Sequence, residues 1–129
     1  MIVLDASAYV DVILRRANDS IYEALDSGGH WLVPEHFRLE VTSVVRAEWL
    51  RGRVDAHGFA AAVAQVAAQD LDVWPTVPLL PRIHELAPNA TAYDAAYLAL
   101  AEELGCPLVT ADVKFARVPG IRCCVVGTD

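Results

Sequence analysis

Short apolar runs and helix-like segments alternate along the whole chain, and this alternation is the feature that most restricts its fold. The apolar runs are rich in β-branched or aromatic residues, and they occupy residues 2–4, 31–33, 73–77, 108–110 and 121–126. Because each run is continuously apolar instead of alternating with polar residues, the pattern is typical of buried strands.

Helical patterns separate these runs. The segment 20–29 ends in glycines, which suit a helix end, and 34–53 begins with a proline, which suits a first turn. The segment 91–105 closes on a glycine as well. Further helical patterns are the alanine-rich residues 59–69 and the short stretch PLLPRIHELA. Together the segments predict an α/β fold: a mostly parallel central sheet of about five strands with helices on both faces.

Length and composition fit one globular domain over residues 1–129, since no linker, repeat or low-complexity segment interrupts the pattern. No run approaches the ~20 apolar residues that span a bilayer. The N-terminal segment has no basic stretch and meets an acid at position 5, unlike a signal peptide. We therefore expect a cytoplasmic protein without membrane contact.

The chain has a net charge of −7, from 17 acidic and 10 basic residues. This balance argues against general nucleic-acid binding, because phosphate contacts need clustered lysine and arginine. Arg38, Arg46, Arg51 and Arg53 nevertheless lie within one segment and permit a local basic patch. An acidic body also favours a basic protein partner.

Cysteine and histidine give no sign of a zinc site. The cysteines are Cys106, Cys123 and Cys124, and the histidines are His30, His36, His57 and His84. An odd number of cysteines without CxxC spacing supports neither a disulfide framework nor a metal cluster. We interpret the cysteines as buried thiols and the histidines as surface or strand-edge residues.

Two of the apolar runs lead directly into an aspartate, Asp5 in IVLDAS and Asp112 in LVTAD. Each aspartate suits a helix N-cap or a turn. Ligands of doubly wound folds, however, bind outside the carboxyl ends of the strands, near the point where strand order reverses. Both acids are therefore predicted to lie at the functional edge of the sheet.

Two further acids fall on helical segments. Glu40 lies on the flank of the apolar stripe that begins at Phe37, where a glutamate either extends to solvent or serves a site. Asp94 follows Thr91 by three residues, as in a capping box, and its spacing to Tyr97 places it along the buried side of the helix. Capping and function are both compatible with Asp94.

Brought together, these four carboxylates would repel one another and raise their pKa values. A hard divalent cation removes this repulsion, because Mg²⁺ and Mn²⁺ take oxygen ligands. An acid-only site of this kind typically positions and deprotonates a water for attack on a phosphodiester. Ser7 and Thr110, each two residues from one of the strand-end acids, offer hydroxyls to hold that water or a carboxylate.

Three stretches resemble PIN-domain ribonucleases, and more closely the VapC-type toxins of bacterial toxin–antitoxin pairs. They are IVLDASAYVD, VPEHFRLEVTSVVRAEWLRGRVD and AYDAAYLALAEELGCPLVTADVKFAR, in the family's order and spacing. The resemblance runs from residue 1 to about residue 126 and implies a PIN-like domain. The family's acidic quartet falls on Asp5, Glu40, Asp94 and Asp112, and its hydroxyl positions fall on Ser7 and Thr110.

The resemblance implies a Mg²⁺-dependent endoribonuclease that forms a homodimer, with Mn²⁺ able to replace Mg²⁺. It also implies inhibition by a VapB-type antitoxin whose basic segment enters the acidic groove, and contact with DNA only through that antitoxin. The chain departs from the family at one point. Relatives often carry a basic residue directly after the last aspartate, whereas Val113 here precedes Lys114.

Three other functions compete with this interpretation. Haloacid-dehalogenase-type hydrolases need a second acid two residues after the first, where this chain has Ser7. Receiver domains need paired acids after the first strand and a lysine after the last, and neither is present. A catalytically degenerate PIN fold kept as a binding module is countered by the intact quartet, and a metal titration distinguishes it from an active enzyme.

Overall fold

Five parallel strands form one sheet in the computed structural model, which describes residues 1–27 and 29–129. The strands are β1 (Ile2–Leu4), β2 (Trp31–Pro34), β3 (Asp72–Trp74), β4 (Leu108–Val109) and β5 (Val125–Val126). Their order is β3-β2-β1-β4-β5, and every neighbouring pair is parallel. The predicted α/β fold with a parallel sheet is confirmed.

The sheet reverses its strand order between β1 and β4. The chain begins at the central strand, adds β2 and β3 on one side, and then crosses over to add β4 and β5 on the other. Because parallel crossovers are right-handed, connections that run in opposite directions place their helices on opposite faces of the sheet. Such folds bind ligands outside the carboxyl ends of the strands where the order reverses, which here are the ends of β1 and β4.

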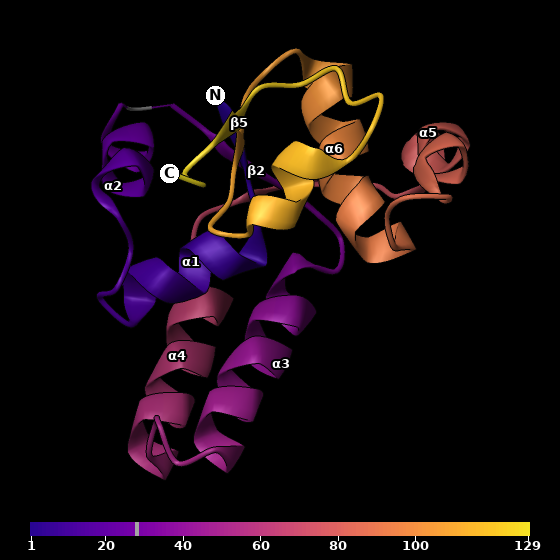
Figure 1. Ribbon diagram of the computed structural model, residues 1–129. Coiled ribbons are helices and arrows are strands. Elements are labelled where there is room, and N and C mark those ends of the chain that lie inside the picture. The colour runs from indigo at the N-terminus through magenta and orange to yellow at the C-terminus, as the bar shows by residue number, and fades with distance from the viewer. Residues whose placement is uncertain (28) are drawn as a thin grey trace.

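Over the described residues, six α-helices and two short 3-10 helices connect the strands. The α-helices are α1 (Ala6–Ile13), α2 (Asp19–Asp26), α3 (Phe37–Leu50), α4 (Ala56–Ala68), α5 (Leu80–Leu86) and α6 (Ala92–Leu104), and the 3-10 helices are η1 (Val77–Leu79) and η2 (Val113–Arg117). Figure 1 shows α3 and α4 as a helical hairpin that extends away from the sheet, with α5 and α6 on the side opposite α2. None of these helices combines the length and apolar character needed to cross a bilayer.

Helix boundaries differ from those predicted mainly at Pro34, which the sequence pattern interpreted as the start of a helix. Pro34 ends β2 instead of opening a helix, and α3 begins three residues later at Phe37. The helix expected over 20–29 ends at Asp26, and Gly28, one of its predicted stop residues, lies outside the described residues. Gly105 ends α6 as expected, with a left-handed φ of 63° that glycine adopts without strain.

The outer strands are not the buried strands that the sequence pattern predicted. β3 covers only the start of the 73–77 run, and Val73 is 46% exposed. β5 covers only the last two residues of the 121–126 run, and both are half-buried. The reason is topological, since β3 and β5 are the sheet edges, whereas β1 is covered from all sides. Continuous apolar sequence identified the strands but not their burial.

The core lies between the sheet and the helices that pack on it. Its largest fully buried side chains include Tyr97 of α6, Phe37 of α3 and Phe115 of η2. Cys106 is buried as predicted, but Cys124 is exposed, so the interpretation of all three cysteines as buried thiols is wrong. Cys124 precedes the edge strand β5, where only one side of the chain is covered.

Candidate functional site

The two strand-end acids lie on neighbouring strands at the same edge of the sheet. Leu4 pairs with Val109, so Asp5 leaves β1 beside the end of β4, and Asp112 follows three residues after that pair. Asp5 caps α1 by accepting the Ser7 N–H at 3.3 Å, and Asp112 caps η2 by accepting the Lys114 N–H at 3.0 Å. The capping interpretation thus holds for both acids, and it does not exclude a shared site.

The two helix-borne acids face the same region. Asp94 lies in the first turn of α6, where its N–H donates to the Thr91 hydroxyl at 3.2 Å, and Glu40 lies in the first turn of α3. Burial is the main reason that the pKa of Glu40 rises to about 7, and the charges of Asp5 and Asp94 raise it further. The fold therefore brings Asp5, Glu40 and Asp94 close enough to influence one another.

Asp5 is the most buried of the four and is held by hydroxyls. Its Oδ2 accepts hydrogen bonds from the Ser7 hydroxyl and, at 2.8 Å, from the Thr110 hydroxyl. The two hydroxyl oxygens also lie 3.2 Å apart, and Thr110 Oγ1 accepts the Asp112 N–H at 3.0 Å. Burial raises the pKa of Asp5, while these hydrogen bonds oppose the rise. Ser7 and Thr110 thus link the two strand-end acids.

Lys114 completes the cluster from η2. Its Nζ lies 3.0 Å from Asp94 Oδ2 and 3.2 Å from Asp112 Oδ2, so one ammonium bridges the two acids. From the sequence, Lys114 stood out only as a departure from the family pattern, one position later than the usual basic residue. The spacing Asp-x-Lys was the signal available, because an aspartate that caps a turn accepts the N–H two residues on and so holds that residue beside its carboxylate.

His36 was also missed. It was interpreted as a surface or strand-edge residue, but its Nε2 is buried, lies 3.6 Å from Glu40 Oε2 and has no hydrogen-bond partner in the described part of the chain. The ring packs edge-on against Tyr93 and Tyr97, and burial lowers its pKa. The spacing of four residues to Glu40, one helical turn, was the sequence signal for this contact.

Tyr97 supports the other oxygen of the same glutamate. Its hydroxyl donates to Glu40 Oε1 at 3.3 Å, and the ring is fully buried in the core. Burial is the main cause of a raised tyrosine pKa here, and the charges of Asp5 and Glu40 raise it further. Tyr97 thus remains a neutral donor that fixes one side of Glu40, while Oε2 faces His36.

The donor set of the site suits a hydrated hard cation. In residues 1–27 and 29–129, no three carboxylate, imidazole or thiol groups are arranged to hold a metal ion directly. Asp94 and Asp112, however, already bracket one cation, the Lys114 ammonium. Mg²⁺ usually keeps several waters and is bound through one or two carboxylates, so a pair of this kind fits it.

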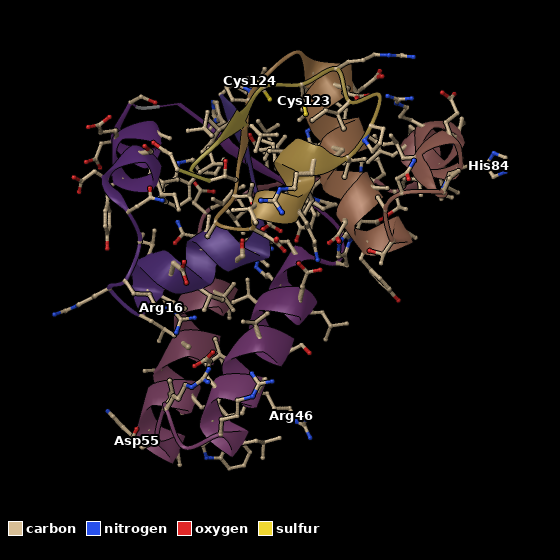
Figure 2. The ribbon with its side chains drawn as sticks, in the orientation of Figure 1. Arg16, Arg46, Asp55, His84, Cys123 and Cys124 are labelled. Carbon is tan, nitrogen blue, oxygen red and sulfur yellow. The ribbon has the colours of Figure 1, made fainter. Side chains whose placement is uncertain are left out.

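The predicted basic patch is smaller than the sequence allowed. Arg38 turns inward and donates to the carbonyls of Val66 and Gln69 at 3.0 and 2.8 Å, so it ties α3 to α4. Arg53 pairs with buried Glu48 at 3.4 Å. Figure 2 shows Arg46 projecting from α3 into solvent, and this side chain is exposed on the outer part of the hairpin.

Thr110→Val is expected to destabilise the protein by about 1–3 kcal/mol, the typical cost of leaving buried polar partners unsatisfied. Valine has nearly the shape of threonine, but it loses the hydroxyl that serves Asp5 and the Asp112 N–H. Urea denaturation of wild type, Thr110→Val and Thr110→Ser measures the effect. The serine variant keeps the hydroxyl and should lose less; a valine variant as stable as wild type would contradict the assignment.

Comparisons with known proteins agree with this architecture. A family model described as PIN domain matches residues 2–121. Ribonuclease VapC12 of Mycobacterium tuberculosis is 34% identical over 120 residues, which cover 93% of this chain and 93% of the relative. Ribonuclease VapC9 of the same species is 36% identical over 123 residues, which cover 95% of this chain and 94% of the relative.

Solved structures share the fold at lower sequence identity. VapC20 of Mycobacterium tuberculosis, described as a sarcin-ricin loop cleaving toxin, has a TM-score of 0.66 at 17% identity and covers 95% of this chain and 97% of its own. VapBC2 from Rickettsia felis, bound to a DNA fragment from its promoter, has a TM-score of 0.67 at 17% identity, with 98% and 99% covered. At these identities the likeness concerns the fold alone.

Proposed function

Because the chain belongs to the PIN-domain family and, within it, to the VapC group, we propose that it is a metal-dependent endoribonuclease, the toxin of a type II toxin–antitoxin pair. One observation carries the proposal: Asp5, Glu40, Asp94 and Asp112 gather at one edge of the sheet, where two of them share a cation. The ribonuclease names of the relatives support RNA as the substrate. Such a substrate is consistent with action in the cytoplasm.

In the proposed reaction, the four acids share the tasks of holding the metal, orienting it and accepting a proton. Bound Mg²⁺, or Mn²⁺ in its place, would act as a Lewis acid and lower the pKa of a coordinated water. Asp94 and Asp112 would hold the cation, and Asp5, fixed by Ser7 and Thr110, would help to orient it. Glu40, whose pKa burial raises to about 7 in the metal-free protein, would accept a proton at Oε2, since a general base works best near the operating pH.

The proposed inhibitor is a VapB-type antitoxin with a basic segment. The chain's net charge of −7 and the acids of the site attract such a segment and repel acidic competitors. A basic side chain of the partner can take the position between Asp94 and Asp112 that Lys114 holds here. The proposed contact with DNA is indirect, through the antitoxin, in line with the promoter-bound complex of similar fold.

The proposed homodimer uses an apolar face beside the site. Leu39 is 75% exposed and Tyr93 65% exposed, and Val77 and Leu80 are exposed as well. A hollow of about 270 Å³ links Leu39 to Tyr93, and another of about 200 Å³ links Tyr93 to Leu80. Leu39, Tyr93 and Leu80 therefore lie side by side on one face, and contiguous apolar surface of this kind marks protein interfaces.

The decisive experiment is cleavage of RNA by purified protein with Mg²⁺, with Mn²⁺ and with EDTA. Cleavage is expected with either metal and is expected to stop in EDTA, because the carboxylates alone supply no Lewis acid. Readdition of excess Mg²⁺ should restore it. Undiminished cleavage in EDTA would exclude the mechanism, whereas metal binding without any cleavage would favour the degenerate binding module.

A further inference from the structure

Lys114 is the only lysine of the chain, and its backbone is fixed while its side chain extends into solvent beside the acids. Its N–H donates to Asp112 Oδ1 at 3.0 Å, and the next residue, Phe115, is fully buried and anchors η2 in the core. The side chain itself is 60% exposed. A flexible four-carbon stem on a fixed root lets the ammonium leave the acids without any change in the fold.

The ammonium occupies the position between two carboxylates that come from different elements. Asp94 belongs to α6 and Asp112 to the cap of η2, and Nζ lies 3.0 and 3.2 Å from one oxygen of each. Without this charge, the two carboxylates would face each other and two further acids with no cation between them. Lys114 therefore supplies the local counter-charge of the site.

We propose that Lys114 is a tethered counter-ion that competes with the metal ion for Asp94 and Asp112. This inference rests on the proposed function, because it assumes that the same two carboxylates hold the metal. A divalent cation has twice the charge of the ammonium and carries its own waters, so it displaces the lysine when its concentration is high enough. The competition lowers the affinity for metal. In the metal-free protein, the ammonium also reduces the repulsion between Asp94 and Asp112.

The test is metal binding, independent of RNA cleavage. Isothermal titration calorimetry with Mn²⁺ and with Mg²⁺ compares wild type, Lys114→Met and Lys114→Arg at low salt. Lys114→Met is expected to bind metal about three- to tenfold more tightly, the size of two partly exposed ion pairs. Lys114→Arg keeps the positive charge and is expected to stay within about twofold of wild type. Higher salt should reduce the difference in metal affinity between Lys114→Met and wild type, because it screens the ion pairs of Lys114.

Arg117→Met is the matched control. Arg117 is exposed at the end of the same 3-10 helix, so its loss changes the net charge equally at three residues' distance. Metal affinity should remain within about twofold of wild type for this variant. In EDTA, Lys114→Met should melt at a lower temperature than Arg117→Met and should gain more from added metal.

The outcomes separate the inference from the proposed function. The competition would be overturned if wild type and Lys114→Met bound the metal with equal affinity. It would also be overturned if Arg117→Met raised the metal affinity as much as Lys114→Met does. Tighter metal binding by Lys114→Met without any RNA cleavage by wild type supports the competition and refutes only the nuclease. Absence of metal binding in every variant refutes both. Binding by Lys114→Met alone supports the competition in its strongest form.

Discussion

Asp94→Asn is expected to abolish RNA cleavage while the fold remains intact. The loss should be on the order of 10²- to 10⁴-fold, the range seen when a group that acts directly in catalysis is removed. Asparagine keeps the size of the side chain but cannot provide the negative charge that pairs with a cation at 3.0 Å. The N–H contact to Thr91 is a backbone interaction and survives the change.

Initial cleavage rates and thermal melts, measured on the same preparations, test this prediction. Asp70→Asn is the matched control, because it makes the same substitution on an exposed loop outside the acid cluster. It should retain wild-type activity. An Asp94→Asn variant with wild-type cleavage would show that this acid has only a capping or charge role. A variant that unfolded would assign Asp94 to stability, and Asp112→Asn would then decide the catalytic question.

Metal-free protein is expected to lose stability as the pH rises from about 4.5 to 7, and Glu40→Gln should remove much of this loss. The folded protein raises the pKa of Glu40 from 4.5 to about 7, chiefly through burial. A raised carboxyl pKa means that the folded state holds the proton more tightly than the unfolded chain. Its contribution is complete below pH 4.5 and disappears as the pH passes through 7.

At neutral pH and without metal, the free energy of unfolding of Glu40→Gln is expected to exceed that of wild type by about 1–2 kcal/mol. One pKa unit corresponds to about 1.4 kcal/mol, and solvent at a side chain that is 27% exposed reduces the full effect. The stability of Glu40→Gln should still fall somewhat with rising pH, because the pKa of Asp5 is also raised. Urea denaturation in EDTA from pH 4.5 to 8 measures the trend. Glu103→Gln on the exposed side of α6 is the control and should follow wild type.

Added Mg²⁺ should reverse this trend in wild type, because the metal binds the deprotonated acids of the folded state. Glu40→Gln should gain less from Mg²⁺ than wild type does. A flat pH profile for metal-free wild type, or an unchanged slope in Glu40→Gln, would contradict the raised pKa. Parallel changes in Glu103→Gln would assign the effect to net charge instead of to the site.

Sequence periodicity predicted the order of the elements because each depends on local chemistry. Asp5 and Asp112 follow apolar strands, and the direction of a parallel sheet then places both at one edge. The side-chain contacts between elements were harder to predict from the sequence. His36 and Lys114 reach the acids through side-chain geometry, and their spacing to Glu40 and Asp112 indicated only that a contact was possible.

Burial was the other property that local pattern did not determine. Val73 has the sequence surroundings of a core strand, but it lies on an edge strand and is 46% exposed. Arg38 has the surroundings of a surface arginine, but it bonds two carbonyls near the end of α4. In both cases the neighbour that decides the outcome comes from a distant part of the chain, so a local window contains no information about it.

The pairing of β1 with β4 also governs when activity can arise during synthesis. Val3 pairs with Leu108, so the central strands come from nearly opposite ends of the chain. Such non-local pairing forms late, after most of the chain is available. A nascent chain on the ribosome lacks Asp112 until translation has passed β4, and the proposed catalytic quartet is incomplete until then. A given copy therefore gains its proposed nuclease activity only after its own Asp112 has been made and β4 has joined β1.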